Sequence, residues 1–129
     1  MPPKVEKFSL SKTNMILRLK SRHWIEDAQG HMIMGEGRLR ILEVIKEKRS
    51  LAEAAKALGM SYRALWGKLK ATETAIGEPL VDSTKAKGTN LTPLAEKLLA
   101  KYEEFKRRCQ ISEELLFQEL FGELLDSNQ

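Results

Sequence analysis

Residues 50–70 read Ser50-Leu-Ala-Glu-Ala-Ala-Lys-Ala-Leu-Gly-Met-Ser61-Tyr-Arg-Ala-Leu-Trp-Gly-Lys-Leu-Lys70, and this stretch decides the fold. Ser50 can cap a first helix, and Glu53, three positions later, completes a capping box. Gly59 can end that helix in the left-handed conformation, and Ser61 can cap a second one. Because only residues 59–61 link them, the two helices must cross steeply, as in a helix-turn-helix unit.

The predicted second helix, from about residue 62 to 76, has a core face and an open face. Leu65, Leu69 and Ile76 recur at helical spacing and should face the core. The opposite side can read DNA, because it combines side chains that reach bases or phosphates with a glycine that permits close approach. The predicted contact residues are Arg63, Gly67 and Lys70 on this side, with Ser61 and Tyr62 at the start of the helix. Trp66 lies between the faces and is interpreted as a packing residue, and the alternative for the open face is an ordinary solvated surface.

A short hairpin is predicted after this helix. Leu80-Val81 and Leu91-Thr92 are strand candidates, separated by a polar loop that carries Lys85 and Lys87. The two lysines could lie along a phosphate backbone, and the alternative is an ordinary surface hairpin. Thr92-Pro93 has the sequence of a helix start, with threonine at the cap. The predicted hairpin is therefore the wing of a winged helix-turn-helix.

The N-terminal part is predicted to be a loosely ordered arm, residues 1–14, followed by a β-hairpin. Leu17 and Leu19 alternate with basic residues, which is typical of a half-buried strand. Residues 27–30 form a predicted turn, residues 31–34 a return strand, and residues 35–48 a helix. The expected fold class is mainly α with small β elements. The expected domains are the arm, a DNA-binding domain over residues 15–92, and a C-terminal helical extension over residues 93–129.

The C-terminal extension is predicted to hold two copies of the chain together. Leu94, Leu98, Tyr102 and Phe105 recur at helical spacing, and at Ser112 the helix either restarts with a fresh cap or continues. The residues that follow carry too much apolar surface for a free terminal helix, so we expect them to form a homodimer seam. The predicted seam residues are Leu116, Phe117, Leu120, Phe121 and Leu124.

Charge and composition agree with a nucleic-acid partner. The 129 residues carry a net charge of +4, and residues 1–92 hold 17 Lys and Arg against 10 Asp and Glu. Residues 93–129 hold 5 against 8, so the basic charge coincides with the predicted reader. The single cysteine, Cys109, excludes an intramolecular disulfide and favours a cytoplasmic location. No apolar run approaches the length of a membrane span.

The chain resembles the DNA-binding domain of the molybdate-responsive transcription regulators, the ModE family, over roughly residues 15–106. The resemblance rests on the N-terminal strand pair and on Gly35-Glu-Gly-Arg-Leu-Arg40, Ala54-Ala-Lys-Ala-Leu-Gly-Met-Ser-Tyr-Arg63, Trp66, Gly77-Glu-Pro-Leu-Val81 and Leu91-Thr92-Pro93. Residues 50–92 also resemble LysR-type regulators. The resemblance implies a transcription regulator whose recognition helix carries the contact residues named above.

Two features depart from the ModE pattern. Members of that family continue into a molybdate-binding β-domain, which nothing in this sequence matches, and their wing is longer and richer in glycine. We therefore expect no direct molybdate sensing and no cofactor, and any small-molecule effector is unknown. His23 and His31, the only histidines, have no metal or nucleophile spacing with Cys109, so we expect neither an enzyme nor a metal site. The alternatives to a ModE-like regulator are a winged-helix module for protein contact and a LysR-like regulator fragment.

Overall fold

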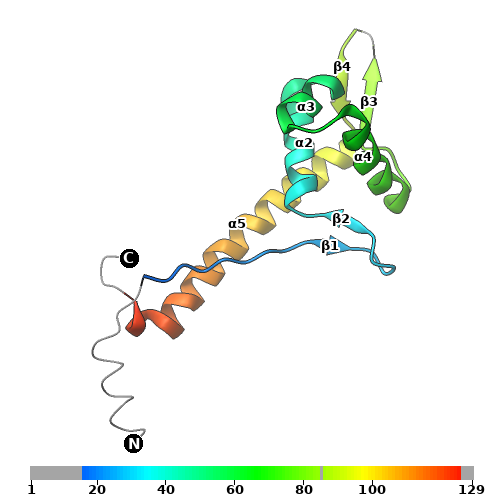
Figure 1. The fold of residues 1–129 in the computed structure, drawn as a ribbon. Coiled ribbons are helices and arrows are strands. Elements are labelled where there is room, and N and C mark those ends of the chain that lie inside the picture. Colours follow the sequence, from blue (N-terminus) through cyan, green and yellow to red (C-terminus); the bar gives the residue numbers. More distant parts are fainter. Residues whose placement is uncertain (1–15, 85, 126–129) are drawn as a thin grey trace, which may run out of the picture. The chain divides into compact units, whose positions relative to one another are not determined.

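The computed structural model describes residues 16–84 and 86–125 (Figure 1). The fold is rich in helix and has two small antiparallel hairpins, which confirms the predicted fold class. Residues 23–106 form one compact unit, and the described residues up to 22 and from 107 belong to a second. The predicted arm, residues 1–14, lies outside the described residues. The predicted functional division at residue 92 stays a prediction.

Three helices, α2 (Glu36–Lys48), α3 (Leu51–Leu58) and α4 (Tyr62–Ile76), lie together in the first unit (Figure 1). Their ends are set by local hydrogen bonds, as the sequence predicts. The Ser50 hydroxyl accepts the Glu53 N–H at 3.1 Å, and the Ser61 hydroxyl accepts the Ala64 N–H at 3.0 Å. Gly59 ends α3 with a φ of 69°. The helix-turn-helix is thus confirmed to the residue.

The core of this unit lies between the three helices, β4 and the beginning of α5 (Pro93–Phe121). Leu65 and Leu69 bring one face of α4 into it, as predicted, while Ile76 is only partly buried. The other buried side chains are Met34, Leu39, Ile41, Leu42, Val44, Ile45, Leu51, Ala54, Ala55, Leu80, Leu91, Ala95, Leu99 and Tyr102. This continuous apolar cluster fixes α4 so that its opposite face is directed to solvent.

The N-terminal hairpin is shorter than predicted. It pairs β1 (Ile25–Glu26) with β2 (Met32–Met34) around a turn in which Asp27 Oδ1 accepts the N–H groups of Gln29 and His31, each at 2.9 Å. The predicted strand around Leu17 and Leu19 was wrong, because these residues lie outside any strand. Alternation alone does not make a strand, and no strand within residues 16–84 and 86–125 pairs with this segment.

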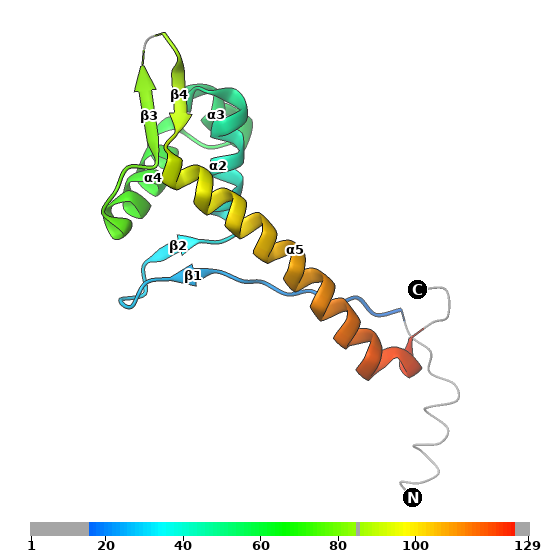
Figure 2. The same ribbon diagram turned by 180° about the vertical axis from the view of Figure 1, so that it is seen from behind.

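The wing is longer than predicted. It pairs β3 (Val81–Thr84) with β4 (Gly88–Leu91), with Val81 opposite Leu91 and Thr84 opposite Gly88 (Figure 2). Most of the segment predicted as a polar loop is therefore a paired ribbon. Thr92 lies outside the strand but caps α5, as its place before Pro93 predicted, since its hydroxyl accepts the Ala95 N–H at 3.2 Å.

Arg49 attaches the wing to the end of α2. Its backbone adopts the left-handed conformation, with a φ of 57°, and its carbonyl oxygen accepts the Thr89 N–H at 3.0 Å. Its guanidinium donates to the Lys87 carbonyl oxygen at 2.6 Å. Gly88 lies against the same carbonyl, and a Cβ added there would stand 2.6 Å from the Arg49 oxygen. This close backbone contact requires glycine, as does the Gly88 φ of 72°.

α5 continues through Ser112 without a fresh cap, so the second of the two predicted possibilities is correct. Its buried face was placed slightly wrong. Ala95, Leu99 and Tyr102 are buried, whereas Leu94 and Leu98 are only partly covered, and Phe105 is 44% exposed. A short 3-10 turn, η1 (Gly122–Leu124), follows the helix. None of the helices in the described ranges is long and apolar enough to cross a membrane.

Candidate nucleic-acid interface

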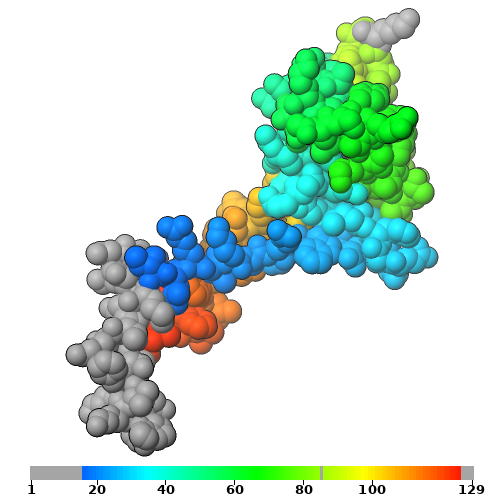
Figure 3. Space-filling view, viewed as in Figure 1, coloured from blue at the N-terminus to red at the C-terminus, as the bar shows by residue number. Residues whose placement is uncertain are grey.

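The open face of α4 is the strongest candidate for a binding surface. Arg63, Gly67 and Lys70 are exposed on the side of the helix away from Leu65 and Leu69, and Ser61 and Tyr62 are exposed at its first turn. The space-filling view shows α3 and α4, in green, side by side at the surface of the unit of residues 23–106 (Figure 3). The structure therefore leaves all the predicted contact residues of this helix accessible, three on its open face and two at its start. Their role in binding stays a prediction.

The two predicted basic contacts on this face differ in how they are held. Lys70 Nζ lies 2.9 Å from Glu73 Oε1, one turn further along α4. Among the described residues, Arg63 has no ion-pair partner. Because the charge of Lys70 is partly neutralised within the protein, Arg63 offers the more available cation.

Glu73 connects α4 to the base of the wing. Its side chain is almost completely buried, and Oε2 accepts the Leu80 N–H at 2.7 Å. Desolvation by burial alone would raise the pKa of the Glu73 carboxyl. The hydrogen bonds from Leu80 and Lys70 outweigh it, so the pKa lies below its ordinary value. The ionised carboxylate thus holds both the wing base and the Lys70 ammonium group.

Trp66 was placed wrongly as a packing residue. Its side chain is 42% exposed, and the Lys70 ammonium nitrogen stands 4.5 Å from the centroid of its ring. This geometry is that of a cation–π contact. Tyr62, Trp66 and Lys70 follow at intervals of four residues, and that spacing was the sequence signal for one continuous row on the helix surface.

Gly67 has no structural reason to be a glycine. A Cβ added there would meet no atom of the chain within 4 Å, and its backbone is not in the left-handed region. Glycine inside a helix lowers stability by roughly 0.5–1 kcal/mol relative to alanine. No contact within the chain compensates for this loss of stability. Glycine at the centre of an exposed face is therefore consistent with the close approach of another molecule.

The wing carries one predicted contact that can be located. Lys87 is exposed, and its backbone is held by the Arg49 guanidinium and by its own N–H bond to the Thr84 hydroxyl at 2.9 Å. Its ammonium group is thus carried on an anchored turn. Lys85, the other predicted wing contact, lies outside the described residues.

The predicted dimer residues all lie in the second unit. Leu116, Leu120 and Phe121 are exposed, Leu120 by 62%. Phe117 and Leu124 are half-buried, and the ring centroids of Phe117 and Phe121 are 5.4 Å apart. The end of α5 therefore leaves a substantial apolar surface in contact with solvent.

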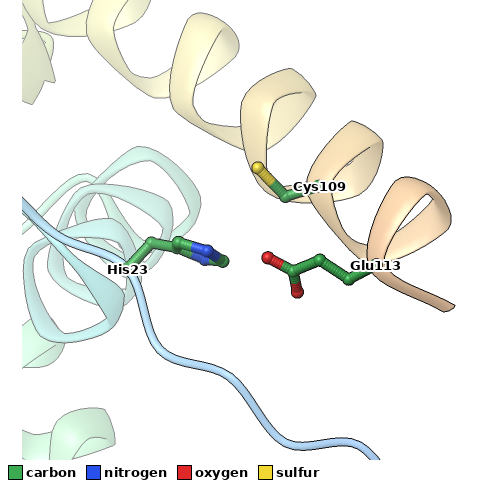
Figure 4. Close-up of side chains that lie close together, drawn as sticks. All are labelled: His23, Cys109 and Glu113. Carbon is green, nitrogen blue, oxygen red and sulfur yellow. The ribbon is translucent and has the colours of Figure 1, made fainter. Parts of the chain in front are cut away.

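Cys109 and Glu113 are four residues apart on α5, and Figure 4 shows both side chains. The Glu113 carboxylate accepts a hydrogen bond from the Ser21 hydroxyl at 2.6 Å. His23, also labelled in Figure 4, belongs to the unit of residues 23–106. Two ligand atoms on one helix are fewer than a zinc site needs, so this part of α5 does not by itself form a metal site.

Part of this chain is similar to known proteins. Residues 37–96 match the model of the bacterial regulatory helix-turn-helix protein, lysR family. The molybdenum-pterin-binding protein MopB of Rhodobacter capsulatus is 34% identical over 73 residues, which are 54% of this chain and 27% of that protein. The molybdenum transport protein ModE of Azotobacter vinelandii is 32% identical over 73 residues, with the same two shares. The chain thus spans about a quarter of the length of these curated relatives.

Solved structures support the same fold. The crystal structure of the CbnR_DBD–DNA complex is similar with a TM-score of 0.54 and 21% identity, covering 67% of this chain and 99% of that chain. At this identity the likeness shows the fold alone. Residues 37–96 thus match the lysR-family helix-turn-helix model, and the structure has the winged helix-turn-helix fold that residues 50–92 predicted.

Proposed function

We propose that this chain is a transcription regulator that binds double-stranded DNA sequence-specifically, with α4 in the major groove. The observation that carries the proposal is the open face of α4, where Arg63, Gly67 and Lys70 are exposed opposite a buried anchor of Leu65 and Leu69. A helix held in this way can enter the major groove and place the side chains near its N-terminal end against base edges. The solved relative with a similar fold is itself a DNA complex.

The wing would act differently from the helix. Lys87, held on the turn anchored by Arg49, would attract phosphates without reading sequence. Lys85 is proposed for the same role from the sequence. Each phosphate contact adds roughly 0.9 to the slope of log affinity against log salt concentration. The wing should therefore affect the salt dependence of binding and leave the choice of base to α4.

The active form is proposed to be a homodimer that pairs through residues 93–125. The exposed apolar end of α5 supports this proposal, because a large apolar side chain gains roughly 1.5–3 kcal/mol on full burial. A two-fold dimer would present two copies of α4 to successive major grooves, about 34–36 Å or a multiple of this apart. The preferred binding site would then be an inverted repeat.

Within this class, ModE-type recognition is the finer proposal. It is supported by the similarity to MopB and ModE, which covers about half of this chain. The LysR family match supports a LysR-like regulator equally well. The predicted cytoplasmic location and the expectation that the chain is not an enzyme stay predictions.

The test is a selection of duplexes from a random-sequence library, followed by fluorescence anisotropy with the selected site at several salt concentrations. Arg63→Ala should cost about 1–3 kcal/mol of binding free energy on that site. Lys70→Ala should cost less, because Lys70 is already paired with Glu73. The matched control is Lys101→Ala, which removes an exposed cation from α5.

Two outcomes would count against the proposal. If no duplex is enriched and binding to DNA does not weaken with salt, the domain is not a DNA reader and the protein-contact alternative gains support. If a site is enriched but Arg63→Ala and Lys70→Ala together leave its affinity unchanged, the wrong face of α4 has been assigned.

A further inference from the structure

The row formed by Tyr62, Trp66 and Lys70 contains a feature that the predicted set of DNA contacts does not use. Tyr62 is 52% exposed, and Trp66, at the centre of the row, presents a large apolar ring to solvent. Exposed tryptophan is costly to keep on a monomer surface, because its apolar area gains free energy when it is covered. The exposed apolar ring of Trp66 can therefore contact a molecule that binds to α4.

The ring of Trp66 is held in place before any ligand arrives. The Lys70 ammonium group stands over it at 4.5 Å, and Glu73 holds that ammonium group at 2.9 Å. Glu73 is in turn fixed by the Leu80 N–H at the base of the wing. This chain of contacts connects the wing to the ring, so the ring is preorganised and loses little freedom on binding.

The position beside Trp66 leaves room for a ligand to come close. Gly67 has no Cβ, and the space where one would stand contains no atom of the chain within 4 Å. A groove edge can therefore approach the α4 backbone next to the indole ring.

We propose that Trp66 is a specificity residue that contacts the C5 methyl group of a thymine in the major groove. This inference rests on the proposed function. The thymine methyl is the one apolar group that base pairs display in the major groove, and apolar side chains recognise it by contact. A neutral aromatic ring gains nothing from phosphates, whereas it gains free energy by covering a methyl group.

The test uses the duplex selected by the protein, with each thymine replaced in turn by deoxyuracil, which lacks only the methyl group. Wild-type protein should lose affinity by about fourfold at one thymine in each half-site, the effect of exposing one methyl group. Trp66→Ala should bind the thymine and uracil duplexes equally at that position, while other positions keep their effects. The matched control is Trp24→Ala, which removes an exposed tryptophan outside α4 and should behave as wild type.

A second measurement follows the side chain directly. The chain has two tryptophans, so Trp24→Phe leaves Trp66 as the only one. Acrylamide should quench its fluorescence less in the presence of the selected duplex than in its absence. Unchanged quenching would overturn the inference, as would a Trp66→Ala protein that keeps the uracil effect or that loses affinity equally with and without the methyl group. If no duplex is selected at all, the proposed function fails and this inference fails with it.

Discussion

Gly67→Ala should make the free protein more stable and its complex with DNA weaker. Alanine in a helix interior is favoured over glycine by roughly 0.5–1 kcal/mol. Nothing in the chain opposes the gain, because the added Cβ would have no neighbour within 4 Å. For a compact unit of this size, that gain corresponds to an increase in melting temperature of roughly 2–8 °C.

The loss on DNA has a different origin. If a groove edge comes close to Gly67, the added methyl group must displace it, and overpacking of this kind costs about 1–3 kcal/mol. A cost near the middle of that range weakens binding by roughly thirtyfold. Stability would be measured by thermal and urea unfolding, and affinity by anisotropy with the selected duplex.

Gly37→Ala is the matched control for this experiment. Gly37 also lies within a helix, near the start of α2, and a Cβ there would likewise meet nothing within 4 Å. This variant should gain stability of similar sign without losing affinity for DNA. The reasoning is refuted if Gly67→Ala is more stable than wild type and binds DNA as tightly. The DNA would then not come close to the backbone at Gly67. A Gly67→Ala protein that is destabilised would refute it as well.

Three further predictions concern the wing, the dimer and the carboxylate of Glu73. Gly88→Ala should lower the free energy of unfolding in urea by more than Gly30→Ala, because both residues have positive φ but only Gly88 meets backbone at 2.6 Å; equal losses would contradict the close contact. Phe117→Glu with Leu120→Glu should give a monomer in analytical ultracentrifugation, and a wild type that is already monomeric at micromolar concentration would refute the proposed seam. The pKa of Glu73 is lower in the folded protein than its ordinary value of 4.5, so its stabilising contribution is present above that pH and is lost as the pH falls through the folded pKa. Glu73→Gln should therefore reduce the loss of melting temperature on acidification below pH 4.5, and an unchanged acid profile would show that this carboxylate contributes nothing.

The helix ends were predictable because their causes are local. Ser50 and Ser61 accept hydrogen bonds from N–H groups three residues later, and Gly59 adopts the left-handed conformation at the end of α3. Such interactions depend on a few neighbouring residues, so they can be read without knowing the fold. The buried positions of Leu65 and Leu69 followed from helical spacing in the same way.

The strands and the buried face of α5 were less predictable because they depend on partners that are distant in the chain. Among the described residues, the alternating segment at Leu17 and Leu19 has no strand to pair with. The wing is longer than predicted because β3 and β4 pair over four residues each. The choice of Ala95 and Leu99 over Leu94 and Leu98 on α5 depends on how that helix packs against the core. Helical periodicity does not decide which of these residues faces the core. The apolar stripe on the helix is wider than its contact with the core, so the helix could pack in more than one rotation about its axis.

The sequence by itself determined the class of the domain, the turn between α3 and α4, and the residues available on the open face of α4. Only the tertiary structure decided how those residues are held. It buried Glu73 and bonded its carboxylate to the Leu80 N–H at the base of the wing, and it attached the wing to the end of α2 through Arg49. The physical reason is range. Caps and helical faces are set by residues within one or two turns, whereas the wing contacts and the Leu80 hydrogen bond that helps to lower the pKa of Glu73 arise only when separate segments meet.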